Sequence, residues 1–199
     1  MFESVAEKKG IEYGIIRGNG TLFYVKVGNG GDIYGYKNRY LTIAEQIYGE
    51  AGCSVLVASN PVEMSLKEGM TLDMDFAREC FPDAVEIRAM GHSNGGQMLA
   101  TCACLYPMIK RVLAVNAPLM INLHRTKAGI FGFEGDRMQM VYGSKDPSHL
   151  YLPVLNACVS EKFGYSVVEN ADHDFNTMLE EFIALPKRYL FYEGGEYVG

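Results

Sequence analysis

The chain has 199 residues and a net charge of −6; 48% of its residues are hydrophobic and 21% are charged. This length and composition predict one folded domain over residues 1–199, because such a chain encloses one sizeable core. The acidic pI of 5.3 argues against a nucleic-acid partner, which needs a basic surface. We expect a cytoplasmic protein without a membrane span, since no apolar run approaches the roughly 18 residues required and the first residues do not resemble a signal peptide.

The N-terminal part of the sequence predicts an antiparallel hairpin. Residues 11–17 and 21–27 are rich in strand-forming residues, and Asn19-Gly20 between them supplies the positive φ that a tight turn requires. From residue 21 onward, apolar runs alternate with helical patterns. The apolar runs are 21–27, 53–59, 85–90, 111–116, 137–142 and 165–169.

Most of these runs are apolar nearly throughout, which is typical of strands covered on both faces in a parallel sheet. Apolar spacing predicts one helix around residues 40–48 and another starting near Phe175, with Asp174 as its N-cap. Residues 118–135 lack periodicity and are expected to form a loop or small cap. The predicted fold is α/β, with a doubly wound, mostly parallel sheet of about seven strands, an N-terminal antiparallel hairpin strand, helices on both faces, and minimal or no lid.

A serine lies where the run 85–90 ends and a helix is expected to begin. Its surroundings read Gly91-His92-Ser93-Asn94-Gly95-Gly96, and the glycines allow a sharp turn that lifts the Ser93 hydroxyl above the sheet. The start of the following helix offers free amides and positive dipole to an oxyanion. A serine hydroxyl needs a base to remove its proton and a carboxylate to orient that base.

Two later strand ends supply both groups. Asp146 follows the run 137–142, and His173 follows the run 165–169. Ligands gather at the carboxyl ends of parallel strands, so Ser93, Asp146 and His173 are expected to converge there. Other Asp and His residues are less suitable as the acid or the base. Each of them precedes a strand, does not follow a strand end, or lies directly beside Ser93 or His173. They are Asp136, Asp172, Asp174, His92, His124 and His149.

With these three motifs, GHSNGG, YGSKDP and ADHDF, the sequence resembles the α/β-hydrolase superfamily from about residue 21 to 185. The chain order Ser, Asp, His matches that of the family. The resemblance implies a nucleophile elbow at Ser93, with Asp146 as the acid and His173 as the base. It also implies an oxyanion hole made by two backbone N–H groups, from Asn94 and from Asn29 or Gly30.

The expected activity is a serine hydrolase that cleaves a small-molecule carboxylic ester or thioester through an acyl-enzyme, without cofactor or metal. The alternatives are an idle hydrolase-fold protein that binds a ligand or acts as a scaffold, and an amidase, peptidase or non-hydrolytic enzyme with the same triad. The five cysteines are expected to be free thiols, since Cys102 and Cys104 lack the spacing of a zinc hook. Two Asn residues at strand ends, Asn60 and Asn116, either line the substrate pocket or merely accompany prolines that end their strands.

Overall fold

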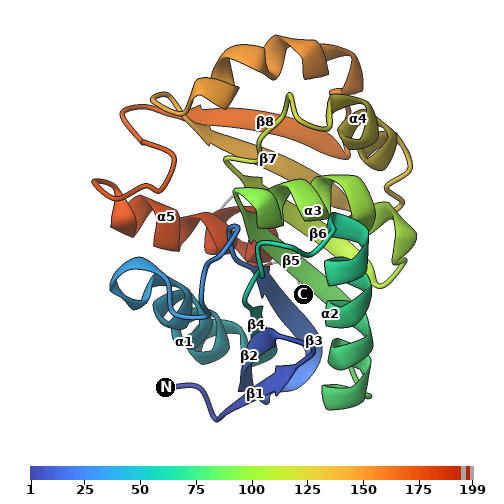
Figure 1. Ribbon diagram of the computed structural model, residues 1–199, viewed down its shortest axis with the longest axis vertical. Helices are drawn as coiled ribbons and strands as arrows, with labels where there is room; N and C mark the ends of the chain where they lie inside the picture. The colour runs from blue at the N-terminus through green and yellow to red at the C-terminus, as the bar shows by residue number, and fades with distance from the viewer. Residues whose placement is uncertain (194–195, 198–199) are drawn as a thin grey trace.

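The computed structural model describes residues 1–193 and 196–197. Within them, eight strands form one sheet in the order β1-β2-β4-β3-β5-β6-β7-β8 (Figure 1). The strands are β1 (Ser4–Lys8), β2 (Ile11–Ile16), β3 (Asn19–Lys26), β4 (Cys53–Ala58), β5 (Glu86–His92), β6 (Ile109–Val115), β7 (Arg137–Gly143) and β8 (Phe163–Val168). A separate ribbon pairs β9 (Tyr192–Glu193) with β10 (Glu196–Tyr197).

The helices connect these strands. The α-helices are α1 (Arg39–Ala51), α2 (Leu66–Cys80), α3 (Asn94–Cys102), α4 (Leu123–Phe131) and α5 (Leu179–Pro186). The other helical segments are η1 (Tyr36–Asn38), η2 (Ala103–Leu105), η3 (Pro147–Cys158) and η4 (Lys187–Phe191). The strands from β3 to β8 pair in parallel, as their apolar sequences predict. The predicted fold class is confirmed.

The N-terminal hairpin is present, but with a partner different from the one expected. β1 pairs antiparallel with β2, and the turn between them holds Lys9 at φ 53° and Gly10 at φ 78°. The expected pairing of residues 11–17 with 21–27 is wrong, because β4 lies between them, antiparallel to β2 and parallel to β3. Asn19 already belongs to β3, and its N–H donates to the carbonyl of Gly52 just before β4. The chain therefore crosses over at Asn19-Gly20 instead of folding back.

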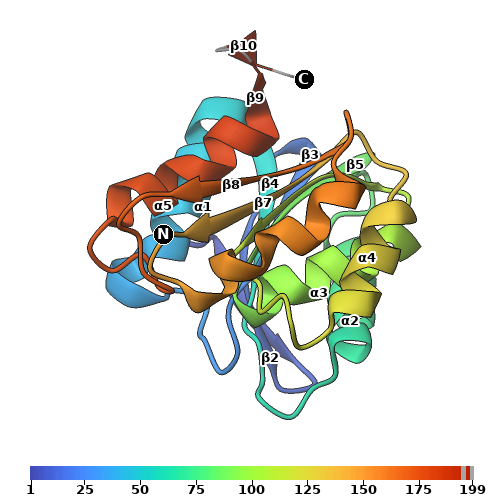
Figure 2. The same ribbon diagram turned by 90° about the horizontal axis from the view of Figure 1, so that it is seen from above.

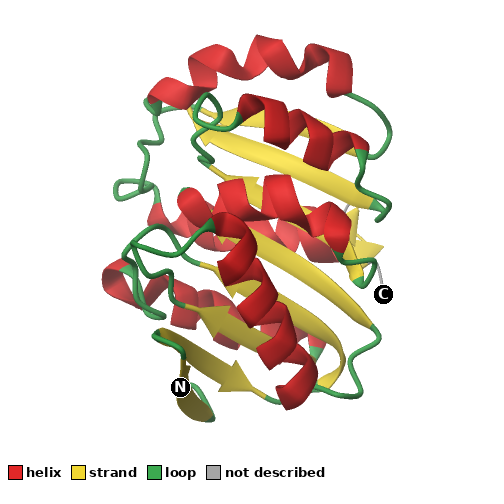
Figure 3. Ribbon diagram, turned by 45° about the vertical axis from the view of Figure 1, so that its right-hand side comes forward, coloured by secondary structure: helices red, strands yellow, loops and turns green. Residues whose placement is uncertain are grey.

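Helices cover both faces of the sheet. α1, α5 and η4 pack on one face, while α2, α3, α4 and η3 pack on the other, and each side has its own apolar core. Figure 2 shows the sheet between these two layers, and Figure 3 shows its twist. This architecture leaves the carboxyl ends of the parallel strands free to carry a site.

The structure corrects the start of the last helix. α1 is followed by Gly52 in the left-handed conformation, which is typical of the residue that ends a helix. α5, however, begins at Leu179, and Asp174 is not its N-cap. Phe175 has a φ of 54° and its ring is buried against Phe182, so the chain turns into the core there before the helix starts.

Residues 118–135 contain a helix of the outer layer instead of only a loop or cap. α4 packs closely on α3, where an added Cβ at Gly129 would lie 2.2 Å from the Ala100 carbonyl oxygen. Gln97 on α3 donates to the Thr126 hydroxyl over 2.8 Å. Because this contact face is made partly of a glycine and a threonine, the sequence shows little apolar periodicity. The residues of this segment do not line the cleft beside Ser93.

A buried ion pair fixes the ends of β3 and β4 near the site. Lys26 Nζ lies 2.8 Å from Asp73 on α2 and donates to the Ser59 carbonyl over 2.7 Å. Tyr13 and Tyr24 donate their hydroxyls to the same carboxylate. All the polar groups of this cluster are therefore paired, as burial away from water requires.

The five cysteines are free thiols, and Cys53, Cys102 and Cys158 are buried. Burial raises the pKa of the Cys53 thiol to about 12, which keeps it protonated. Among the described residues, no helix has the length and apolar character to cross a bilayer.

Candidate active site

Ser93 occupies a strained turn between β5 and α3. Its backbone has φ 52° and ψ −121°, a conformation that costs a non-glycine residue about 1–3 kcal/mol. The surrounding structure holds it there: the Ser93 N–H donates to the Val115 carbonyl, and the Ser93 carbonyl accepts from Gln97. The turn therefore presents the hydroxyl at the carboxyl edge of the sheet, as the GHSNGG motif predicts.

Close backbone packing explains the glycines of this turn. A Cβ on Gly91 would lie 2.4 Å from the Gly95 oxygen, and one on Gly95 would lie 2.2 Å from the Lys26 oxygen. Even an alanine would therefore push α3 away from β5 or β3. The loop after β3 reaches the same place, since a Cβ on Gly28 would lie 3.3 Å from the Ser93 Cβ.

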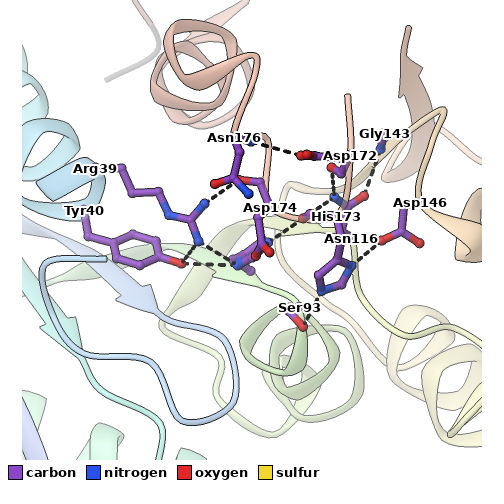
Figure 4. Close-up of polar contacts among 11 residues, drawn as sticks. Arg39, Tyr40, Ser93, Asn116, Gly143, Asp146, Asp172, His173, Asp174 and Asn176 are labelled. Atoms are coloured by element: carbon purple, nitrogen blue, oxygen red, sulfur yellow. Dashed lines mark hydrogen bonds and ion pairs between the residues drawn. The ribbon is translucent and has the colours of Figure 1, made fainter. Parts of the chain in front are cut away.

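The structure brings Ser93, His173 and Asp146 together (Figure 4). His173 Nε2 lies 2.9 Å from Ser93 Oγ, and His173 Nδ1 makes a short contact with Asp146 Oδ2. Because a carboxylate only accepts, Nδ1 carries the proton and Nε2 is free to accept from the Ser93 hydroxyl. In this arrangement the imidazole could take the hydroxyl proton while the carboxylate orients the ring.

The Asp146 carboxylate is buried and held from two sides. Burial alone raises its pKa, but hydrogen bonds from His173 and from the Ser148 backbone N–H outweigh burial and hold the pKa below its usual value. The pKa of His173 is raised, chiefly because its imidazolium hydrogen-bonds to Asp146. The pair therefore stabilises positive charge on His173, which is the charge that the imidazole would gain if it took a proton from Ser93.

The loop after β3 and the start of α3, which both carry backbone N–H groups, lie close to Ser93. Asn94 is the first residue of α3, so its N–H has no intrahelical acceptor. Of the two alternatives in the loop after β3, Gly30 donates to the Asn60 carbonyl over 2.7 Å, whereas the Asn29 N–H has no hydrogen bond within the described residues. Asn29 thus offers the free donor.

Asn60 does more than follow the end of its strand. It connects the loop after β3 to the start of α3. Its side-chain amide donates to the Val27 carbonyl over 3.1 Å and to the Asn94 side chain over 3.0 Å. Its backbone N–H donates to Gly31. The buried Asn60 therefore fixes the loop after β3 relative to the start of α3.

Three buried side chains behind His173 complete the arrangement. They are Arg39, which was not a candidate from the sequence, and His92 and Asn116, for which the sequence predicted no such contact. His92 Nε2 and Asn116 Nδ2 both donate to the His173 carbonyl, and Arg39 donates to the Asp174 carbonyl. The sequence did contain a signal for Arg39. A cation in the first turn of a helix interacts unfavourably with the helix dipole, so its presence there indicates a specific contact.

The remaining candidates lie elsewhere or do other work. Asp136 is exposed and precedes β7, at the opposite edge of the sheet. His124 is exposed on α4, and His149 lies in η3, where its ring contacts the Asp146 carbonyl. Asp172 accepts from the Asn176 N–H and thereby shapes the loop that carries His173.

An open cleft of about 580 Å³ adjoins Ser93 and His173. The backbone of residues 28–31 forms one wall, and Tyr36, Asp174 and Asn176 contribute side chains to the others. None of the described residues that line it is aliphatic. The cleft surface is somewhat more polar than apolar, in contrast to the mostly apolar pockets that bind drug-like ligands.

One group of side chains in this cleft has the composition of a metal site. Ligand atoms of His92, His173 and Asp174 lie within 4.8 Å of one another in the described part of the chain. However, His92 Nε2 carries the proton that it donates to a carbonyl, and both ring nitrogens of His173 are engaged. A metal ion would have to replace these hydrogen bonds, so the donor set does not fit one.

Comparison with known proteins identifies the fold. No family model matches the chain, and no curated protein matches its sequence. Est1E from Butyrivibrio proteoclasticus has a TM-score of 0.73 at 13% identity, covering 92% of this chain and 95% of that one. An alpha-beta serine hydrolase homologue from Coxiella burnetii has a TM-score of 0.71 at 16% identity, covering 93% and 96%. Dienelactone hydrolase from Anabaena variabilis has a TM-score of 0.65 at 13% identity, covering 90% and 92%. The chain has the α/β-hydrolase fold.

Proposed function

We propose that this protein is a serine hydrolase that cleaves carboxylic esters or thioesters through an acyl-enzyme. The observation that carries the proposal is the 2.9 Å contact between Ser93 Oγ and an imidazole nitrogen whose ring is oriented by the buried Asp146. Structural neighbours that are described as an esterase domain and a serine hydrolase homologue support it at the level of the fold.

In the proposed reaction, Ser93 Oγ attacks the acyl carbon while its proton passes to His173 Nε2. The resulting imidazolium is stabilised by Asp146 and then protonates the leaving alkoxide or thiolate as its bond to the acyl carbon breaks. Water, deprotonated by His173, attacks the acyl-enzyme. The Ser93–acyl bond breaks, Ser93 recovers its proton, and the acid is released.

The oxyanion of the tetrahedral intermediate would accept hydrogen bonds from the backbone N–H groups of Asn94 and Asn29. Asn94 directly follows Ser93, Asn29 lines the same cleft as Ser93, and neither N–H is used within the described residues, whereas Gly30 is committed to Asn60. A single donor of this kind is worth about 10²–10³ in kcat. Asn60 supports the site by fixing both segments.

The substrate class follows from the lining of the cleft. With Asp174 and Asn176 in its walls and no aliphatic side chain, the cleft offers a long acyl chain less apolar contact than a mostly apolar pocket would. Hydroxyl or amide groups, by contrast, would find partners there. We therefore infer that the substrate is a short-chain, hydrophilic ester or thioester.

A fluorophosphonate probe should label the wild-type protein once per chain, because Ser93 displaces fluoride at phosphorus and His173 takes the hydroxyl proton. Peptide mass spectrometry should place the adduct on Ser93. A protein that only binds a ligand would not react. Absence of labelling, or an adduct on another residue, would contradict the proposed function.

Acyl-chain preference tests the polarity of the cleft. Turnover of p-nitrophenyl acetate should exceed that of the octanoate ester in kcat/KM. Asn176→Leu should shift the ratio toward octanoate by a factor on the order of ten, since added apolar surface favours the longer chain. Thr177→Leu is the matched control, because Thr177 is adjacent in sequence but lies outside this cleft. A wild-type preference for octanoate would refute the inference about substrate class.

A further inference from the structure

In the loop that carries His173, three consecutive backbone carbonyls accept hydrogen bonds from buried side chains. This loop follows β8 and has positive φ at both Asn170 (64°) and Phe175 (54°). Between them, the carbonyls of Asp172, His173 and Asp174 accept hydrogen bonds from side chains of other elements (Figure 4). A loop with so little regular structure depends on such bonds for its position.

The donors are Arg39, His92 and Asn116, which together we term the carbonyl clamp. Asn116 Nδ2 lies 2.7 Å from the His173 oxygen and 3.1 Å from the Asp172 oxygen. His92 Nε2 lies 2.9 Å from the His173 oxygen. Arg39 Nη1 lies 2.5 Å from the Asp174 oxygen. The relative exposures of the three residues are 6%, 2% and 0%.

Each member of the clamp is itself fixed to a different part of the fold. Arg39 is the first residue of α1, and its guanidinium packs 4.6 Å from the Phe182 ring of α5. His92 ends β5, directly before the serine. Asn116 follows β6, and its Oδ1 accepts from the Gly143 N–H at the end of β7, three residues before Asp146. The clamp therefore ties the His173 loop to the strand ends that carry the other two groups.

His92 is the central member, and its tautomer is determined by its partners. A carbonyl only accepts, so Nε2 carries the proton, and Nδ1 accepts from Arg39 Nη2 and the Tyr40 hydroxyl, each 3.3 Å away. Burial, with help from the positive charge of Arg39, lowers the pKa of His92 to about 3. His92 is thus a neutral donor. A second proton would be bound at Nδ1, where it would face the positively charged Arg39 guanidinium.

We propose that Arg39, His92 and Asn116 are positioning residues that hold the His173 imidazole between Ser93 and Asp146. This inference rests on the proposed function for its kinetic consequence, but the positioning itself can be measured without turnover. A displacement of about 1 Å at a reacting group costs on the order of a hundredfold in rate. The clamp holds the backbone of His173, and the position of that backbone determines where the imidazole lies relative to Ser93 and Asp146.

The pKa of His173 reports whether the imidazole keeps its place. The charged and titratable groups that face His173 are Asp146 from the end of β7, Asp172 and Asp174 from its own loop, and His92 from β5, with Arg39 of α1 beyond His92. His92 is neutral, so replacing it with a neutral residue changes the pKa of His173 only through the position of the ring. A loosened contact with Asp146 would lower that pKa.

The test compares His92→Phe with His92→Gln. Phe keeps an aromatic ring against Phe182 but removes the N–H, whereas Gln retains an amide N–H that can reach the carbonyl. We expect His92→Phe to lower kcat about a hundredfold with little change in KM, to slow fluorophosphonate labelling equally, and to lower the NMR-measured pKa of His173 toward 6.5. The kcat of His92→Gln should be at least tenfold higher than that of His92→Phe. His124→Phe, at an exposed histidine of α4, is the control.

Each outcome decides the matter. If folded His92→Phe keeps the wild-type kcat and His173 pKa, or if Gln loses as much as Phe, the donor does not position His173. If the wild-type protein is not labelled, the proposed function fails, while the pKa of His173 in the two variants still tests the clamp. Should His92→Phe not fold, Arg39→Met keeps an apolar stem against Phe182 and removes the donor to Asp174; it should lower kcat and labelling about tenfold, and unchanged rates would overturn the proposal.

Discussion

Replacing Ser93 with Ala should reduce kcat for p-nitrophenyl acetate by a factor on the order of 10⁶, as expected when the nucleophile of a cooperating triad is removed. The fold should persist, because the Ser93 hydroxyl contacts only His173 among the described residues and the turn is held by backbone hydrogen bonds. Circular dichroism and thermal unfolding would confirm an intact fold, and steady-state kinetics would measure the loss.

Two further serine variants make this result specific. Ser65→Ala removes the N-cap of α2, which costs about 1 kcal/mol of stability, but should leave turnover unchanged. Ser93→Gly should be as inactive as Ser93→Ala and yet more stable than it, since glycine adopts the φ of 52° without strain. Undiminished esterase activity in Ser93→Ala would end the assignment of Ser93 as the nucleophile.

Asp146→Asn should lower kcat/KM about 10⁴-fold, because the substituted amide reverses the tautomer of His173. Asp146 Oδ1 accepts from the Ser148 N–H over 2.6 Å, so the Asn oxygen will take that position. Its NH₂ group then faces His173 Nδ1 and donates to it. The imidazole proton moves to Nε2, which can no longer accept from Ser93.

The pH dependence of this pair follows from the raised pKa of His173. Protonated His173 is favoured in the folded state, so its stabilising effect is complete below about pH 6.5 and is lost as the pH rises through the raised pKa. Turnover needs the neutral imidazole and therefore increases over the same range. In wild-type protein the midpoint of kcat/KM should lie above 6.5, and in Asp146→Asn it should fall below the wild-type value.

Asp136→Asn serves as the control for this experiment, because Asp136 is exposed at the opposite edge of the sheet. It removes one negative charge without touching the site, so rate and midpoint should match those of the wild type. Equal pH profiles for wild type and Asp146→Asn would show that Asp146 does not act on His173.

The sequence predicted the strand ends that meet in space but not how the loops between them are held. Ser93, Asp146 and His173 could be identified because each follows an apolar run, and parallel strands bring such positions to one edge. The sequence could not show that the Gly30 N–H donates to the Asn60 carbonyl, which is the observation that favours Asn29 as the proposed donor. The contacts of the carbonyl clamp were equally hidden, because they go to backbone atoms that carry no sequence signal.

The two fold predictions that were wrong failed for a common physical reason. Asn19-Gly20 has the composition of a hairpin turn, but the pairing of β3 with β4 over a long separation in sequence overrides that local preference. Phe175 fits an apolar helical stripe, yet its burial against Phe182 requires a left-handed backbone that excludes helix at that point. In both places tertiary packing decided what local pattern could not.

The glycine turn around Ser93 also bears on how this protein could acquire new substrates. Main-chain atoms of β3, β5 and α3 are in close contact there, and this backbone packing sets the position of the hydroxyl. Residues such as Tyr36 and Asn176 can then be exchanged during evolution with little effect on the reacting atoms. Under the proposed function, selectivity and chemistry are thereby carried by separate parts of the polypeptide, and one can diversify while the other is kept.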